Sequence, residues 1–150
     1  MTNDKIQMTN EKNKKFDLED RTLRFAINVI YICNTINKDV INENLIHQLI
    51  RASGSIGANY REANDSISKK SFYHLIGICR REAKETRYWL QLLQYNNSGH
   101  KDRLDFLIDE AFQLAKIFAS IGKKIFDNFK IIYSIVIDAL TFVIKERSYT

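Results

Sequence analysis

Six basic side chains between residues 69 and 87 are the groups in this sequence best suited to bind another molecule. They are Lys69, Lys70, Arg80, Arg81, Lys84 and Arg87. At 100° per residue on a helix, Arg80, Lys84 and Arg87 share one flank. Lysine and arginine bind phosphates additively and without reading base sequence, and Tyr73 or Tyr88 could stack on a base. The segment therefore predicts a surface for RNA or DNA.

The same cations have a second interpretation. Glu82 and Glu85 are interleaved with them, and Arg81 and Glu85 have the i,i+4 spacing that supports an ion pair on a helix. The cations could then form a solvated face or ion pairs between subunits. Lys69 and Lys70 would oppose the dipole in the first turn of a helix, which favours an anionic partner, but an ordinary solvent-facing pair is the alternative.

No arrangement of residues typical of an enzyme is visible. The three histidines lie in different segments, and no acidic pair has the Glu-x-x-His spacing of di-iron bundles. Cys33 and Cys79 fall within apolar helical patterns and lack metal-type spacing, so we expect two reduced, buried thiols. The sequence predicts no catalytic residue, no metal ligand and no cofactor.

Composition favours one domain built from long helices. The 150 residues are 45% hydrophobic and 27% charged, with five glycines and no proline. Glycine and proline normally punctuate a chain rich in strands, so their scarcity indicates an all-α fold. The net charge of +5 permits anionic partners. The apolar run 131–144 contains Asp138 and is short of the roughly 20 residues that span a bilayer, so we expect no membrane and a cytoplasmic location.

Apolar periodicity predicts four helices, at 17–37, 42–64, 68–95 and 101–129. Asp17 is the expected cap of the first helix, and Ser66 or Ser68 of the third. Because the connections are short, neighbouring helices must be antiparallel to bury their apolar stripes, which gives an up-down-up-down four-helix bundle over residues 16–129. Residues 1–15 are predicted to form a disordered basic N-terminal arm. Residues 130–150 form an apolar C-terminal extension, which we interpret as a packing or pairing segment.

The second predicted helix contains an unusual run of small residues. Gly54 and Gly57 each cost about 1 kcal/mol relative to alanine inside a helix, and they would let a neighbouring element approach closely; a simple kink is the alternative. The polar end of the same helix, and the aromatic pair Tyr88 and Trp89, suit contacts between subunits, although Trp89 could equally pack in the core. The full set of interface candidates is Gly54, Gly57, Asn59, Tyr60, Arg61, Glu62, Tyr88 and Trp89.

Three motifs in order carry a resemblance to a known family. Residues 51–63 read RASGSIGANYREA, residues 68–72 read SKKSF, and residues 79–90 read CRREAKETRYWL. In these motifs, and over about residues 16–127, the chain resembles the bacterial four-helix-bundle proteins encoded within intervening sequences of 23S ribosomal RNA genes.

The resemblance implies an antiparallel four-helix bundle assembled into a ring, usually a homopentamer, with no enzymatic activity assigned. A related branch, the accessory variability determinants of diversity-generating retroelements, resembles basic pentameric barrels that engage a reverse transcriptase and nucleic acid. We therefore expect a non-enzymatic homo-oligomeric scaffold that offers a basic surface to RNA, DNA or a reverse transcriptase. The alternative is a purely structural or protein–protein interaction module without nucleic-acid binding.

Overall fold

The protein is a bundle of four α-helices. The computed structural model describes residues 18–147, so the predicted arm 1–15 and the expected cap Asp17 lie outside the described residues. The helices are α2 (Leu18–Thr35), α3 (Val40–Asn64), α4 (Lys69–Asn96) and α5 (Lys101–Arg147), with a short 3-10 helix, η2 (Ser98–His100), between the last two. No strand occurs in this part of the chain, and the prediction of an all-α fold is confirmed.

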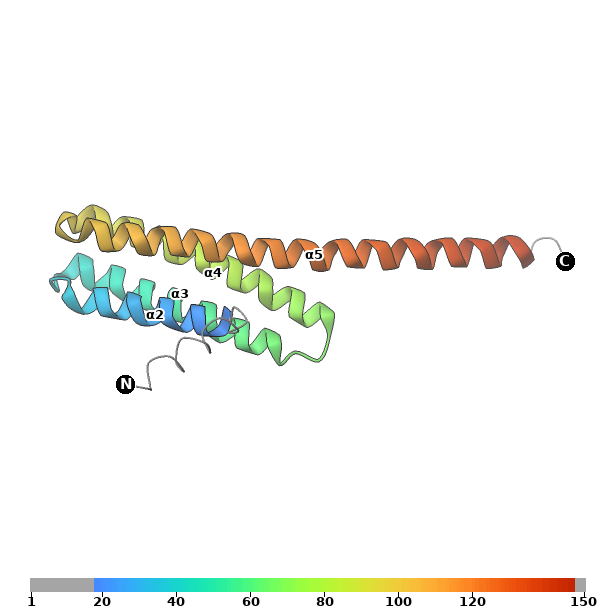
Figure 1. Ribbon diagram of the computed structural model, residues 1–150, viewed down its shortest axis with the longest axis horizontal. Coiled ribbons are helices and arrows are strands. Elements are labelled where there is room, and N and C mark those ends of the chain that lie inside the picture. Colours follow the sequence, from blue (N-terminus) through green and yellow to red (C-terminus); the bar gives the residue numbers. More distant parts are fainter. Residues whose placement is uncertain (1–17, 148–150) are drawn as a thin grey trace, which may run out of the picture.

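Consecutive helices run in opposite directions along the bundle (Figure 1). α4 packs against both α3 and α5, α2 packs mainly on α3, and the contact between α2 and α5 is smaller. This arrangement follows from the short connections, since each chain reversal brings the apolar stripe of one helix against the stripe of the next.

The core is built from the stripes that the periodicity predicts. The largest fully buried side chains include Phe25, Ile32, Leu49, Ile56, Ile76, Leu90, Leu93, Leu104, Leu114 and Phe118. On the first helix the apolar periodicity also predicts Leu23, Ile27 and Ile30 to face the core, and this was wrong, because they are 46%, 52% and 45% exposed. Helix α2 thus has a second apolar face that no described element covers.

Side-chain caps fix where two of the helices begin. The Asp39 carboxylate accepts hydrogen bonds from the backbone N–H groups of Ile41 (2.9 Å) and Asn42 (2.8 Å), so α3 begins at Val40 and not near residue 42. Ser68 Oγ accepts from the N–H of Ser71 at 3.1 Å, which makes Ser68, one of the two expected residues, the cap of α4.

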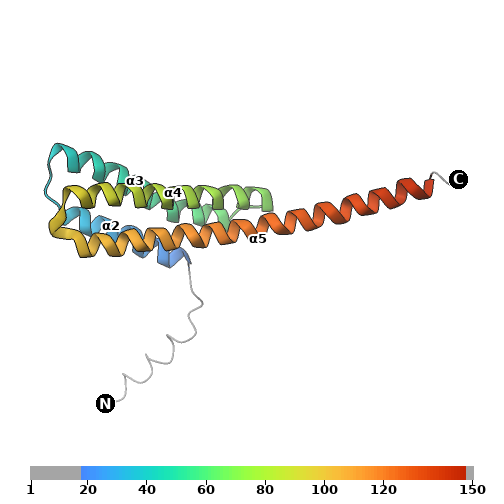
Figure 2. The same cartoon turned by 90° about the horizontal axis from the view of Figure 1, so that it is seen from above.

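The expected end of the last helix near residue 129 was wrong. Helix α5 runs for 47 residues, or about 70 Å, to Arg147. No glycine follows Gly122 and the chain has no proline, so nothing interrupts the backbone hydrogen bonds where the bundle ends. The C-terminal part of α5 extends beyond the other helices in the two perpendicular views (Figure 1 and Figure 2). Within residues 18–147, no helix has the length and apolarity needed to cross a membrane.

The two unusual glycines of α3 have different surroundings. A Cβ atom at Gly57 would lie 3.1 Å from both Thr22 Oγ1 and Arg61 Nη1, so Gly57 permits the close approach of α2 and α3 within one chain. A Cβ atom at Gly54 would meet nothing within 4 Å. The interface role expected for both residues stays a prediction.

Alanine substitutions should separate these two glycines. Gly54→Ala is expected to raise the free energy of unfolding by about 0.5–1 kcal/mol, because alanine costs less backbone entropy in a helix. Gly57→Ala should lose this gain, or destabilise by about 1 kcal/mol, because its methyl group crowds Thr22. Urea denaturation followed by circular dichroism measures both, and equal stabilisation by the two variants would contradict a tight α2–α3 crossing.

Candidate nucleic-acid interface

A shallow groove between α4 and α5 gathers cations from both helices. Arg80, Lys84 and Arg87 line it from α4, and Lys116 and Phe112 line it from α5, around a space of about 280 Å³. The two helices lie side by side over this stretch (Figure 1). Three of the six predicted cations therefore meet at one site, which we call the basic groove.

Cation–π contacts position two of these side chains. The Arg87 guanidinium lies 4.7 Å from the centre of the Phe112 ring, and Lys116 Nζ lies 5.3 Å from the same centre. Arg87 is half-buried, and its Nε atom is buried without a hydrogen-bond partner among the described residues. An aromatic ring thus holds the guanidinium while leaving its charge without a carboxylate.

A second hollow continues the basic groove along the same two helices. Tyr73 and Arg80 line it from α4, and Lys123 and Phe126 line it from α5. The Tyr73 ring stacks on the Phe126 ring with centroids 6.5 Å apart. Lys116 and Lys123 are seven residues apart, two helical turns, so they lie on one side of α5. Neither lysine was among the cations predicted from the sequence, although their seven-residue spacing on the last predicted helix already indicates two cations on one side of that helix.

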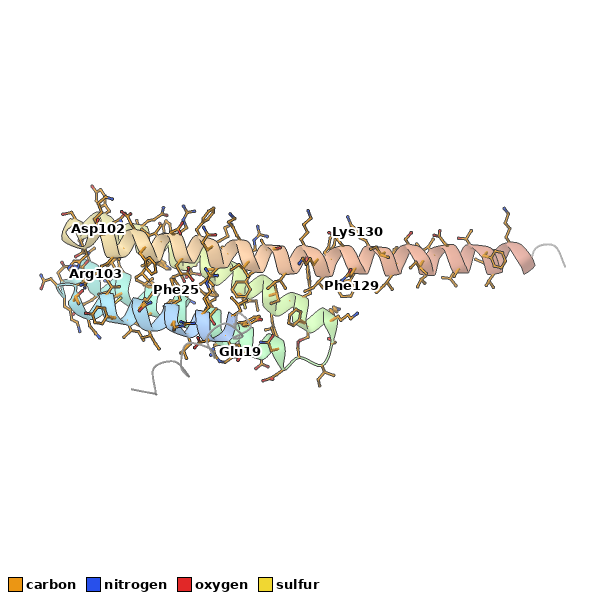
Figure 3. The ribbon with its side chains drawn as sticks, viewed as in Figure 1. Glu19, Phe25, Asp102, Arg103, Phe129 and Lys130 are labelled. Carbon is orange, nitrogen blue, oxygen red and sulfur yellow. The ribbon has the colours of Figure 1, made fainter. Side chains whose placement is uncertain are left out.

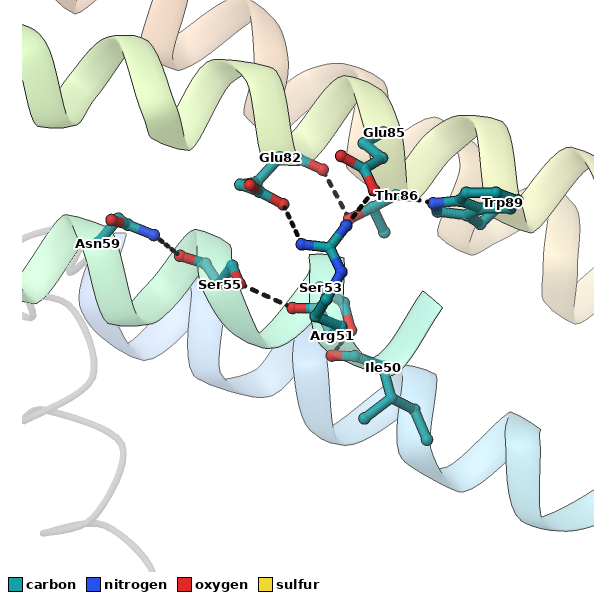
Figure 4. A network of polar contacts seen from close by, with 9 residues as sticks. All are labelled: Ile50, Arg51, Ser53, Ser55, Asn59, Glu82, Glu85, Thr86 and Trp89. Carbon is teal, nitrogen blue, oxygen red and sulfur yellow. Dashed lines mark hydrogen bonds and ion pairs between the residues drawn. The ribbon is translucent and has the colours of Figure 1, made fainter. Parts of the chain in front are cut away.

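The acidic residues of α4 face the other way, toward α3. Arg51 of α3 forms ion pairs with both Glu82 and Glu85, and the Arg51 Nη1 to Glu82 Oε2 distance is 3.5 Å (Figure 4). The Trp89 indole N–H also donates to Glu85 Oε1 at 3.1 Å. Glu85 is therefore engaged by α3 and by its own helix, and no ion pair joins it to Arg81 in residues 18–147.

This arrangement separates opposite charges across α4. Among the described residues, no carboxylate forms an ion pair with any of the basic-groove cations, Arg80, Lys84, Arg87, Lys116 and Lys123. Buried apolar residues of α4, such as Ile76, Ala83 and Leu90, lie between the two charged faces. The basic groove can thus offer several unneutralised cations to an anionic ligand.

The other predicted cations lie away from the basic groove. Lys69 borders a pocket at the beginning of α4 together with Phe129 of α5, and it is 18 residues, about 27 Å along the helix, from Arg87. Lys70 and Arg81 are exposed and line neither part of the groove. The structure therefore brings together only half of the predicted cluster.

The interface candidates at the end of α3 make contacts within the chain. The Tyr60 ring packs edge-on against Phe118 at 5.6 Å, and Asn59 Nδ2 donates to the Ser55 carbonyl at 2.8 Å. Arg61 donates to the carbonyls of Gly57 and Glu19, each at 3.2 Å. The Arg61 bond to Glu19 joins α3 to α2, and the Tyr60 ring joins α3 to α5. A role between subunits stays a prediction.

The remaining interface candidates are more open. Glu62 is exposed, and the exposed Tyr88 packs edge-on against Trp89 with ring centroids 5.1 Å apart. Trp89 is half-buried against the core, in agreement with the core interpretation of this residue. Tyr88 borders the basic groove and is 53% exposed.

The two cysteines are buried and chemically quiet. Burial raises the pKa of the Cys33 thiol to about 11 and that of the Cys79 thiol to about 12, from an ordinary value of 9.0. Cys79 Sγ also lies 3.6 Å from the Ile56 carbonyl oxygen, which it can reach as a weak donor. Both are thiols at neutral pH, a form that is a poor nucleophile. Within residues 18–147, no three side chains among His, Cys, Asp and Glu are placed to hold a metal ion.

The raised pKa values predict slow reaction of both thiols in the folded protein. At pH 8 their thiolate fraction should be about 100-fold or more below that of the unfolded chain, so a disulfide reagent should modify them only in denaturant. Because folding favours the protonated thiols, the stability they contribute below pH 9 should be lost as the pH rises toward 11 and 12. A Thr141→Cys variant supplies an exposed reference thiol, and native cysteines that react as fast as this reference would contradict the burial.

Comparison with known proteins gives a family and a solved structure that are similar to this chain. A model of the family described as 23S rRNA-intervening sequence protein matches residues 14–120. A crystal structure from Bacteroides thetaiotaomicron, of a protein with unknown function from the S23 ribosomal protein family, is 29% identical and has a TM-score of 0.62. The similarity covers 71% of this chain and 99% of that chain. No curated protein matches the sequence, and neither matching description states an enzymatic activity.

Proposed function

Because the chain belongs to the 23S rRNA-intervening sequence protein family, we propose that it is a non-enzymatic helical scaffold that binds the backbone of a nucleic acid along the basic groove. The observation that carries this proposal is the separation of charge across α4. The acids Glu82 and Glu85 are held by Arg51 on the α3 side, while the cations of the groove have no carboxylate partner among the described residues.

The dimensions of the groove suit a single strand. Arg80 to Arg87 on α4 and Lys116 to Lys123 on α5 each span seven residues, about 10 Å. Phosphates spaced at roughly 3.4 Å, as along one strand of a duplex, would number about three over this length, and those of a more extended single strand would be fewer. Tyr73 and Tyr88 border the groove, and a tyrosine ring stacks on any base. Binding would therefore be sensitive to salt and tolerant of sequence.

The names of the relatives make RNA the first ligand to test. The family is named for an intervening sequence of 23S rRNA, and the solved protein is named for a ribosomal protein family. A reverse transcriptase, the partner implied by the related branch, remains a second candidate partner for the same scaffold. A cytoplasmic location stays a prediction.

We also propose that the scaffold is a homo-oligomer, with a pentameric ring as the expected form. The outer face of α2 supports self-association, because it exposes Leu23, Ile27, Ile30 and Tyr31, and Tyr31 lines a pocket together with the exposed Phe106 of α5. Large apolar side chains grouped on one surface usually mark an interaction site. This surface lies away from the basic groove, so subunits could meet there while the groove stays open.

A pair of charge-matched double variants tests nucleic-acid binding. Lys84→Ala with Lys116→Ala removes a groove cation from each helix and leaves Arg87 on Phe112. The slope of log K against log salt should flatten by about 1.5, since each lost phosphate contact removes about 0.7–0.9. The control, Arg24→Ala with Lys101→Ala, removes two cations that pair with Asp20 and Asp105 and should leave the slope unchanged.

Fluorescence anisotropy with labelled single-stranded RNA and DNA of about 20 nucleotides measures the slope. Equal slopes for the two double variants would place binding outside the basic groove. No binding at low salt by the unaltered chain would sink the proposal and favour the structural or protein–protein interaction module.

The α2 face is tested by adding a charge to it. Ile27→Glu should raise the concentration at which the oligomer dissociates by about 10-fold or more, because a buried carboxylate without a partner is costly. Ile41→Glu adds the same charge to another exposed isoleucine, outside this face, and should have little effect. Sedimentation velocity over a dilution series measures the dissociation. A monomeric wild-type chain at micromolar concentration would contradict the oligomer.

A further inference from the structure

The C-terminal part of α5 exposes an apolar surface larger than monomeric proteins usually leave in contact with water. Ten large apolar side chains between Ile131 and Ile144 are each 43–69% exposed. They are Ile131, Ile132, Tyr133, Ile135, Val136, Ile137, Leu140, Phe142, Val143 and Ile144. Beyond the labelled Phe129 and Lys130, Figure 3 shows α5 continuing past the ends of the other described helices. Monomeric proteins rarely expose apolar patches beyond roughly 300–600 Å². We call residues 130–145 the free segment.

We propose that the free segment packs side by side with the free segments of other copies of the chain, in a bundle of at least three such helices. This assigns to the free segment a role that lies beyond residues 14–120, the part of the chain that matches the family. It is also independent of nucleic-acid binding in the basic groove.

The width of the apolar arc around the free segment determines how many neighbouring helices are needed to cover it. Apart from Asn128, which precedes the free segment, the polar residues of this region recur at three- and four-residue steps. They are Asp127, Lys130, Ser134, Asp138, Thr141 and Lys145. At 100° per residue they occupy one stripe of about 80°, and the remaining arc of about 280° is apolar. One neighbouring helix covers an arc only slightly wider than about 100°. A pair of helices would leave much of the arc in water, so each free segment needs at least two neighbours.

The apolar arc continues a surface that is already a core. Along α5, Leu114 and Phe118 are buried inside the bundle, and the same spacing continues through Ile125, Phe129, Ile132 and Val136. Inside the chain, α4 covers this face, and beyond the start of α4 no described helix does. The free segment therefore carries, outside the bundle, the same kind of apolar face that α5 buries against other helices inside the bundle.

The amount and charge of the surface fit copies of the same chain. Ten side chains, each exposing on the order of 100 Å², give roughly 1,000 Å² per copy, more than the roughly 800 Å² that each partner buries in a stable interface. Within the free segment the polar stripe carries one acid, Asp138, between Lys130 and Lys145, together with the uncharged Ser134 and Thr141. A membrane-surface helix instead has a polar face rich in lysine and arginine. This sparsely charged stripe suits the outside of a bundle of identical helices.

Cysteine cross-linking of the full-length chain tests whether the free segments meet. Val136 lies at the middle of the apolar arc, whereas Thr141 lies on the polar stripe and bonds its own Ile137 carbonyl at 2.8 Å. Under mild oxidation, Val136→Cys should form disulfides between copies at least about 10-fold faster than Thr141→Cys. Native Cys33 and Cys79 are buried and should not interfere. Equal rates for the two variants would overturn the proposal.

The number of neighbouring free segments is tested by the molar mass of the Ile27→Glu variant, in which association through the α2 face is weakened. At concentrations where the contacts through the α2 face have dissociated, this variant should still sediment as three or more chains, held by the free segments alone. Adding Val136→Glu should then give monomers, while adding Thr141→Glu should not. A mass of one or two chains in Ile27→Glu, or no response to Val136→Glu, would overturn the bundle. Cross-linking of Val136→Cys that requires vesicles of phosphatidylcholine and phosphatidylglycerol would overturn it in favour of a lipid surface. The salt slope of the basic groove is a separate readout, so failure here leaves the proposed function standing.

Discussion

The rest of the structure depends on one constraint, which is that α4 must bury its apolar stripe against two helices at once. Ile76, Cys79, Ala83 and Leu90 are fully buried between α3 and α5. A helix buried along one stripe has two flanks, and each flank meets a different neighbour. On α4, the flank toward α3 carries the acids that bind Arg51, and the flank toward α5 carries the cations of the basic groove. Packing thus separates charges that the sequence interleaves.

Such a separation has an energetic cost that the aromatic residues reduce. Like charges gathered in one groove repel each other, and a partly buried guanidinium loses hydration. Arg87 and Lys116 both lie over Phe112, and Lys130 lies over Phe126 at 4.7 Å. A ring face stabilises a cation without neutralising it. A carboxylate in the same place would stabilise the fold more and compete with an anionic ligand. The cations of the groove therefore keep their charge for a ligand and forgo the stability that ion pairs with carboxylates would add to the fold.

Local patterns predicted those features that depend on one helix at a time. Periodicity predicted most core residues of α3, α4 and the first half of α5, and Ser68 was one of two serines expected to cap α4. Features that depend on which helices are neighbours were missed. The engagement of Glu85 by Arg51, the contact of Gly57 with Thr22, and the meeting of Lys116 with Arg87 across the groove all join segments far apart in the sequence. The end of α5 was predicted near residue 129, which is where the bundle ends, but the helix itself continues to Arg147.

The continuity of α5 links the basic groove to the free segment. At 100° per residue, Lys116 and Lys123 fall on the same side of α5 as the polar stripe that runs from Asp127 to Lys145. An uninterrupted helix keeps this alignment, since no glycine follows Gly122. An assembly that hides the apolar arc of the free segment must turn the polar stripe outward, and the same rotation turns Lys116 and Lys123 outward. Self-association through the free segment would therefore present every basic groove on the outside, open to a strand that could contact several copies in succession.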